Sequence, residues 1–298
     1  MKTSTIRLTL VAGLMAVTHL VQAASFSGHY PAGVEGIKGG SLPPPGMYLR
    51  DYNLFYYAER FPDIGPPDFS VFTYVQAPRL VWITDKKVLG GYYGMDALFP
   101  FYYAKVDSSV GGPFPDDTFT LGDIFVEPIT LSWHWKQFDL GVGYGFWAPN
   151  GDYDEDGTRP SRLLGKGFWT HMFTVGGTWF VDQEKTWAIS LLNRYEIHME
   201  KEDADWAAGD TFTIEWGFSK SLTKTLDVGL IGYYQTQANN YTGVNAPDIN
   251  DHVVALGPEI SLFTPSVGLI TSLRYAYEWE AKERPQGHTV TLTLTKRF

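Results

Sequence analysis

Charged side chains recur at alternate positions along segments that have the pattern of β-strands. In the segment 186–200 the even positions carry Arg194, Glu196 and His198, whereas the odd positions are apolar except for Asn193. Guanidinium groups bind carboxylates or phenolates, and carboxylates repel anions, so such a row could act as a charge filter. Projecting the alternation along the other segments gives a candidate set for binding a small solute: Asp139, Trp147, Arg194, Glu196, His198, Glu215, Glu259, Arg274 and Glu278.

The same charges also have a structural interpretation, and the sequence leaves both open. An Arg or Lys that faces lipid at the middle of a membrane costs about 2–4 kcal/mol, so these rows, with Glu200 and Glu280, are expected to face inward. Inside a narrow lumen, however, buried charges must be paired. The set therefore predicts either a filter, in which Arg194 and Arg274 bind a phenolate or carboxylate, or a network of ion pairs that fills the space.

Hydrolytic chemistry has one candidate set. Ser132 and His134 lie two residues apart on one face of a predicted strand and Asn193 lies on another, and a serine, a histidine and an orienting amide can hydrolyse lipids. The chain lacks a G-x-S-x-G elbow, cysteine and any cofactor fingerprint. The loop 150–162 groups four acidic residues but has Leu163 where a calcium loop needs glutamate. We expect no enzymatic activity, no cofactor and no bound metal, with a lipid-hydrolysing barrel as the lesser alternative.

The elements that must position these residues are β-strands. The last eleven residues place Val290, Leu292, Leu294 and Phe298 on one face and threonines with Arg297 on the other. This alternation suits a strand with lipid on one face and a wetter lumen on the other. Candidate strands bounded by turn signals cover residues 46–58, 70–85, 88–106, 120–136, 138–149, 167–182, 186–200, 210–222, 226–239, 252–263, 267–282 and 288–298.

The connections between these twelve strands alternate in length. Those at 85–87, 136–137, 182–185, 223–225 and 264–266 are short, whereas those at 59–69, 107–119, 150–166, 201–209 and 240–251 are long. Short periplasmic turns and long outer loops are typical of outer-membrane barrels. The predicted fold is therefore all-β, a twelve-stranded antiparallel transmembrane β-barrel of the outer-membrane type, with both termini in the periplasm.

The composition and the N-terminal region favour an exported protein. The chain has 298 residues, a net charge of −10 and no cysteine, so it is a poor candidate for nucleic-acid binding and has no disulfide framework. Two basic residues precede an apolar run at 8–21, which is shorter than the about 20 residues of a spanning helix. We predict a signal peptide at 1–23, a periplasmic or plug segment at 24–45 and the transmembrane barrel at 46–298.

Two local patterns depart from regular strands. Glycines occupy the inward row at 141–145 and recur at Gly176 and Gly177, where they could clear space for a ligand or for the N-terminal segment, or allow the wall to curve. At 123–128, Asp123, Glu127 and Pro128 interrupt the alternation and predict a β-bulge.

Five stretches of the chain resemble a known family. They are V-E-G-I-K-G-G-S-L-P-P-P-G at 34–46, G-D-I-F-V-E-P at 122–128, L-G-V-G-Y-G-F-W-A-P-N-G-D-Y at 140–153, W-T-H-M-F-T-V-G-G-T-W-F at 169–180 and D-H-V-V-A-L-G-P-E-I at 251–260. Together they resemble the meta-pathway phenol-degradation family of outer-membrane proteins. The resemblance implies a small barrel in the bacterial outer membrane that aids uptake of aromatic or hydrophobic compounds, and it carries no agreed catalytic or binding residues.

Alternation and resemblance together predict passive uptake of small hydrophobic or aromatic solutes. The expected partners are outer-membrane lipid, the solute and the assembly machinery, which would recognise the terminal Phe298; nucleic acid is not expected. The alternative is a closed structural barrel that binds partners through its loops and transports nothing.

Overall fold

The computed structural model describes residues 28–63, 68–107, 119–153, 165–244 and 246–298. No helix in these ranges is long and apolar enough to cross a membrane. The predicted signal peptide and most of the acidic loop 150–162 lie outside the described residues. The strands are β1 (Gly46–Arg60), β2 (Ser70–Val88), β3 (Gly91–Leu98), β4 (Phe101–Asp107), β5 (Thr120–Leu121), β6 (Ile124–His134), β7 (Phe138–Ala148), β8 (Thr170–Phe180), β9 (Trp187–His198), β10 (Trp206–Ala207), β11 (Thr211–Ser221), β12 (Leu226–Gln237), β13 (Thr242–Gly243), β14 (His252–Thr264), β15 (Leu269–Lys282) and β16 (Gln286–Arg297).

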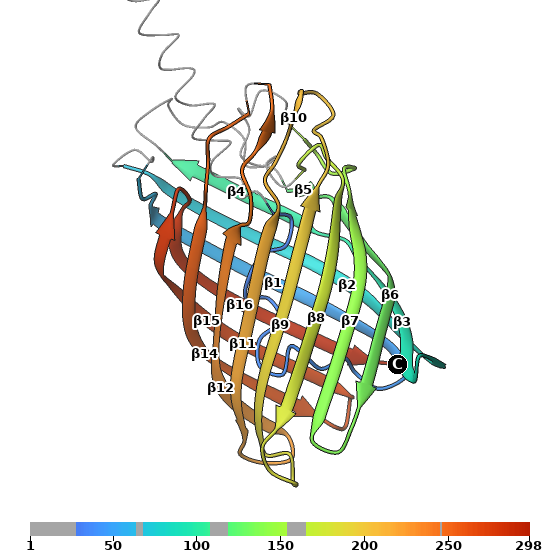
Figure 1. The fold of residues 1–298 in the computed structure, drawn as a ribbon. Coiled ribbons are helices and arrows are strands. Elements are labelled where there is room, and N and C mark those ends of the chain that lie inside the picture. Colours follow the sequence, from blue (N-terminus) through green and yellow to red (C-terminus); the bar gives the residue numbers. More distant parts are fainter. Residues whose placement is uncertain (1–27, 64–67, 108–118, 154–164, 245) are drawn as a thin grey trace, which may run out of the picture.

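These strands close into an antiparallel barrel, because β1 pairs with β16 on one side and with β2 on the other (Figure 1). Two positions of the wall are each built from two consecutive strands: β3 and β4 both pair with β2, and β5 continues into β6. β10 and β13 form a small separate sheet. Counted this way, the described residues form twelve wall positions, as the sequence predicts.

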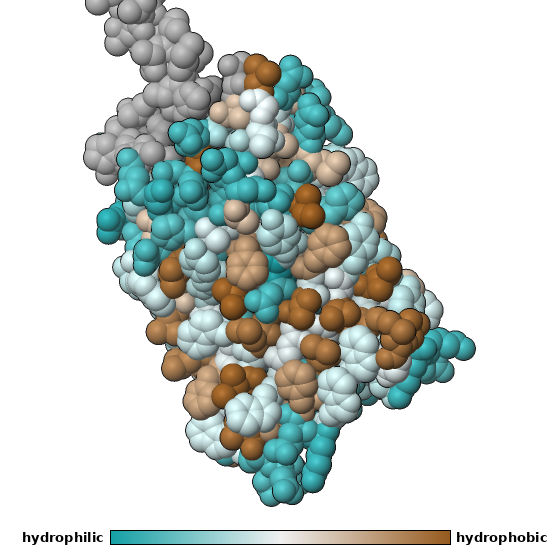
Figure 2. Space-filling view, in the orientation of Figure 1, coloured by the Kyte–Doolittle hydropathy of each residue, from teal (hydrophilic) through white to brown (hydrophobic). Residues whose placement is uncertain are grey.

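The outer surface of the wall is apolar and the inner surface is polar. In β9, Ile189 and Leu191 expose 43% and 45% of their surface, whereas Arg194 and Glu196 expose 5% and 1%. Figure 2 shows apolar side chains across the middle of the barrel and hydrophilic ones at both ends. A closed sheet satisfies its own backbone hydrogen bonds and needs no water along this band, so the wall can span a bilayer.

One predicted turn is displaced. The turn expected at 85–87 lies at Leu89–Gly90, and β2 continues through the charged residues to Val88. Leu89 and Gly90 both have positive φ, 52° and 82°, which is the geometry of a two-residue hairpin turn and explains the glycine. Charge marks the point where the strand leaves the apolar band, and the strand ends only where the backbone can reverse.

The predicted bulge is confirmed. The register of β6 against β7 shifts between Val126 and Ile129, next to Pro128, which cannot donate a ladder hydrogen bond. The extra residue keeps Glu127 on the inner face, where it is 3% exposed, while Thr130 and Ser132 continue the inward row beyond the shift.

Residues 28–45, here called the lumenal segment, run through the inside of the barrel (Figure 1). Near its start, His29 bonds to Thr170, which lies where the long connection before β8 ends. Near its end, Ser41 bonds to Asp139, just after the short turn before β7. The segment therefore passes from the end of the barrel with long connections to the end with short turns, where Phe298 donates its backbone N–H to Met47.

Candidate functional site

Inward carboxylates on β9 and β11 bind the main chain of the first part of the lumenal segment. Glu196 on β9 accepts the N–H groups of His29 and Tyr30 at 3.1 and 3.0 Å. Glu215 on β11 accepts the N–H groups of Gly33 and Glu35 at 3.0 and 3.2 Å, and also the Tyr30 hydroxyl. These hydrogen bonds satisfy backbone donors of a segment that has no regular structure of its own. Two of the predicted filter carboxylates thus bind the protein's own chain.

The same role extends to β14 and β15. Glu259 accepts the N–H of Ile37 at 2.8 Å and pairs with Arg274 at 3.3 Å. Arg274 donates in turn to the carbonyl oxygen of Val34. Because both groups of this ion pair also bind the lumenal segment, Arg274 is a structural contact in this state.

The inward glycines make room for the lumenal segment. A Cβ added at Gly40 would lie 2.6 Å from the carbonyl carbon of Gly177, and one added at Gly176 would lie 3.0 Å from the Cα of Gly40. A Cβ at Gly217 would lie 2.9 Å from the Cα of Ile37. Of the explanations that the sequence left open for the glycines in β8, close approach of the N-terminal segment is the one seen here.

An apolar cavity of about 180 Å³ lies beside the lumenal segment, toward the end with long connections. Its apolar wall comes mainly from β1, β2, β3 and β4, with single residues from β6, β7 and β8. These residues are Leu54, Val71, Val75, Ala77, Leu98, Ala104, Val106, Phe125, Trp147 and Met172. An engineered apolar cavity of about 150 Å³ binds benzene, so the space is large enough for one aromatic ring.

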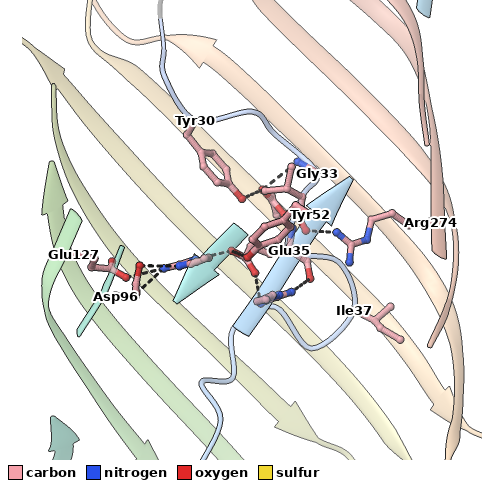
Figure 3. A network of polar contacts seen from close by, with 12 residues as sticks. Tyr30, Gly33, Glu35, Ile37, Tyr52, Asp96, Glu127 and Arg274 are labelled. Carbon is pink, nitrogen blue, oxygen red and sulfur yellow. Dashed lines mark hydrogen bonds and ion pairs between the residues drawn. The ribbon is translucent and has the colours of Figure 1, made fainter. Parts of the chain in front are cut away.

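One side of this cavity is polar. The carboxylate of Glu35 lies between three arginines of the wall, and Figure 3 shows it beside Tyr52, with Asp96 and Glu127 to one side and Arg274 to the other. The guanidinium groups of these three arginines lie 2.6 to 3.3 Å from the carboxylate oxygens, and the Glu35 side chain is 5% exposed. These three ion pairs favour the ionised carboxylate.

A second cluster of polar side chains lies around His29, at the start of the lumenal segment. The His29 ring bonds to Asp123 at 2.8 Å and to the Thr170 hydroxyl at 2.9 Å, and it stacks on Trp147 at 5.4 Å. Burial lowers the pKa of His29, although Asp123 opposes the shift. Burial also lowers the pKa of Lys166, in the connection before β8, to about 8.

The structure sorts the nine predicted site residues into two groups. All nine are at most 7% exposed and lie on inward rows. Three of them line the cavity: Trp147, Arg194 and Glu278. The other six do not line it; they bind the lumenal segment or neighbouring strands, as when His198 bonds to Thr170 and Thr211.

The prediction of an inward position is wrong for two charged residues. Glu200 is exposed just beyond β9, and the side chain of Glu280 is 59% exposed and bonds to His252. A register shift between Val254 and Ala255 in β14 lies opposite Glu280, so the alternation of β15 does not continue there. The alternation predicted these positions only as far as the strands stay regular.

The residues missed by sequence reasoning include Glu35, Arg50, Arg79 and the apolar lining. A signal for the lining exists in β1, where the inward residues Leu54, Tyr56 and Ala58 are as apolar as their outward neighbours. A strand between lipid and a polar lumen should alternate, so loss of alternation marks an apolar space inside.

The proposed Ser–His–Asn set is not brought together. Ser132 is on the inner face of β6, and His134 pairs with Asp139 at 3.1 Å. Asn193 lies on the outward row of β9 and donates to the carbonyl of Val175. Among the described residues, no group of three or more His, Cys, Asp or Glu side chains has the arrangement of a metal site.

Comparison with known proteins decides the family. The family described as "Putative MetA-pathway of phenol degradation" matches residues 57–294. The chain belongs to this family. The match begins within β1, so the lumenal segment and its motif at 34–46 lie outside the matched range. None of the curated proteins matches the chain.

Solved structures support the barrel fold. The COG4313 outer membrane channel from Pseudomonas putida F1 is similar at a TM-score of 0.76 and 14% identity, covering 90% of this chain and 99% of that one. The KdgM porin is more distant, at a TM-score of 0.44 and 9% identity, covering 84% of this chain and 99% of that one. A TodX monoaromatic hydrocarbon channel mutant is similar at a TM-score of 0.45 and 9% identity, covering 92% of this chain and 100% of that one. With its apolar outer band and its family, this barrel is a protein of the bacterial outer membrane.

Proposed function

We propose that this family member is a passive channel for small hydrophobic or aromatic compounds, and that the apolar cavity is where the solute binds. The observation that carries the proposal is the cavity itself. A lumen that passes ions or sugars needs polar side chains, whereas ten apolar side chains line this cavity on the inner face of the barrel. The description of the family refers to phenol degradation, and the COG4313 relative is an outer membrane channel; both support the proposal.

The lumenal segment acts as a plug in this proposal. It spans the lumen in the resting barrel, so a solute enters the cavity from the end with long connections and leaves only when the segment moves. Arg194 lines the cavity and can contact the polar end of a solute, whereas Arg274 is bound to Glu259 and Val34. The exposed ring of Phe298, 74% accessible, is the group that the assembly machinery would recognise in this proposal.

The test is flux of an ionised aromatic into proteoliposomes. Phenol and toluene cross bare bilayers, so the informative solute is benzoate at a pH where it is charged, compared between protein-containing and empty vesicles. Arg194→Ala should change benzoate flux, and Arg274→Ala should act by loosening the plug, which raises flux of unrelated small ions as well. Migration that changes on boiling shows that each variant is a folded barrel.

A closed structural barrel predicts a different outcome. It gives no flux above empty vesicles and no solute binding, while the heat-dependent migration stays intact. That combination would replace the channel proposal by a barrel that acts through its loops.

A further inference from the structure

Glu35 occupies a cationic site that belongs to the barrel wall. One carboxylate oxygen lies 2.6 Å from Nη1 of Arg50 on β1; the other lies 3.1 Å from Nη1 of Arg79 on β2 and 3.3 Å from Nη2 of Arg194 on β9. The Tyr52 hydroxyl donates to the second oxygen at 3.0 Å. Wall residues from three strands thus converge on a single carboxylate (Figure 3), and we call Arg50, Arg79 and Arg194 the arginine site.

Two of the three arginines pair with a carboxylate that the wall does not supply. Arg79 has two further partners, Asp96 and Glu127. Within the described part of the chain, Arg50 and Arg194 form ion pairs only with Glu35. The Nε and Nη1 atoms of Arg194 are buried without a hydrogen-bond partner among these residues. If the lumenal segment moved away, Arg50, whose side chain is 27% exposed, and the buried Arg194 would each lose the ion pair with Glu35. Of the wall carboxylates, Glu215 would still attract Arg194 from a longer distance.

The arginine site adjoins the apolar cavity. Glu35, Arg79 and Arg194 line the cavity together with the apolar residues of β1 to β4. A ligand placed there would have its body against Leu54, Val75 and their neighbours. Its end would lie against the guanidinium groups of Arg79 and Arg194. That shape and charge match an aromatic ring that carries one carboxylate.

We propose that the arginine site is a receptor for the carboxylate of an aromatic acid, and that Glu35 occupies it as a built-in competitor until such a ligand arrives. This rests on the proposed function, since it names the ligand class and the release step of the same cavity. A ligand carboxylate replaces that of Glu35 on the three arginines, so the wall charges stay paired during the exchange. The freed segment then loses its ion pairs with three strands of the wall but keeps its other contacts, such as those of His29 and Lys38, and the plug loosens.

A neutral hydrocarbon lacks this effect. It can fill the cavity but offers no charge to Arg50 or Arg194, so it leaves Glu35 bound. The proposal therefore predicts that ionised and neutral ligands of equal size respond differently to removal of the Glu35 charge.

The experiment measures binding of benzoate and of toluene to the purified full-length barrel in detergent, for the wild type, Glu35→Gln and Asp227→Asn. Glu35→Gln should bind benzoate about tenfold more tightly than the wild type, the size of one charge-assisted hydrogen bond, with toluene unchanged. Asp227→Asn removes a carboxylate that pairs with Lys38 of the segment and neither lines the cavity nor pairs with the three arginines, so it should leave both affinities unchanged. Adding Arg194→Ala to Glu35→Gln should abolish the gain.

The outcomes separate this proposal from the channel proposal. If toluene binds all forms and benzoate binds Glu35→Gln no better than the wild type, the receptor proposal is wrong and the cavity remains a solute site. If both ligands gain equally in Glu35→Gln, the charge has no specific role and the receptor proposal is also wrong. If neither ligand binds any folded form, both proposals fail.

Discussion

The Nζ of Lys38 lies 2.7 Å from Oδ2 of Asp227, which links the lumenal segment to the wall near the short turn before β12. Both side chains are about a quarter exposed, at 27% and 26%. Partly exposed ion pairs contribute about 0–1 kcal/mol, because water and salt screen them. We therefore expect Asp227→Asn to change single-channel conductance in planar bilayers by little, and a large rise would mean that this contact holds the plug.

Glu215→Ala should have a much larger effect on the plug. It leaves three donors without an acceptor, namely the Tyr30 hydroxyl and the N–H groups of Gly33 and Glu35. Each buried donor that loses its partner costs about 1–3 kcal/mol. The lumenal segment should leave the wall, so conductance should rise several-fold above that of Asp227→Asn.

The comparison of these two variants also has a contrary outcome. If Glu215→Ala and Asp227→Asn give the same low conductance while both migrate as folded barrels, the segment is held elsewhere. The arginine site and the Glu259–Arg274 pair would then be the next contacts to remove.

The sequence predicts the wall of this barrel better than its contents. Alternation depends only on lipid outside and polar groups inside, so it places Glu196, Glu215 and Arg274 on the inner face correctly. It gives no information about what those groups bind, because their partners lie about 160 to 240 residues away in the sequence, as with Tyr30 and Glu196 or Val34 and Arg274. A filter and a binding surface for the plug require the same charged rows.

The pH dependence of the plug should follow His29. Its pKa lies below the ordinary 6.5 because burial disfavours the charged ring, with Lys166 adding to this effect and Asp123 opposing it. The neutral ring therefore favours the seated segment at pH values above 6.5, and this contribution is lost as the pH falls through the lowered pKa. Hydrogen exchange at the N–H groups of His29 and Tyr30, corrected for intrinsic rates, should be faster at about pH 5 than at about pH 7.5.

A matched variant identifies the group responsible for this pH dependence. His29→Gln keeps hydrogen-bonding capacity but does not titrate, so its corrected exchange rate should be nearly independent of pH. His198 and Glu196 also face this end of the segment. An unchanged pH profile in His29→Gln would assign the effect to one of them.

Gly40 should be indispensable for seating the plug, because its main chain packs directly on that of Gly177. A Cβ there would lie within 2.6 Å of the Gly177 carbonyl carbon, and backbone in a closed sheet cannot yield as a side chain can. Gly40→Val should raise conductance as strongly as Glu215→Ala while heat-dependent migration is kept. The control is Gly141→Ala, whose added Cβ would meet Leu42 Cδ1 at 3.4 Å, an ordinary contact, and which should conduct like the wild type. If Gly40→Val also conducts like the wild type, the segment can leave β8 without opening the lumen. The contacts that keep the lumen closed would then be those of Glu35 and Glu215.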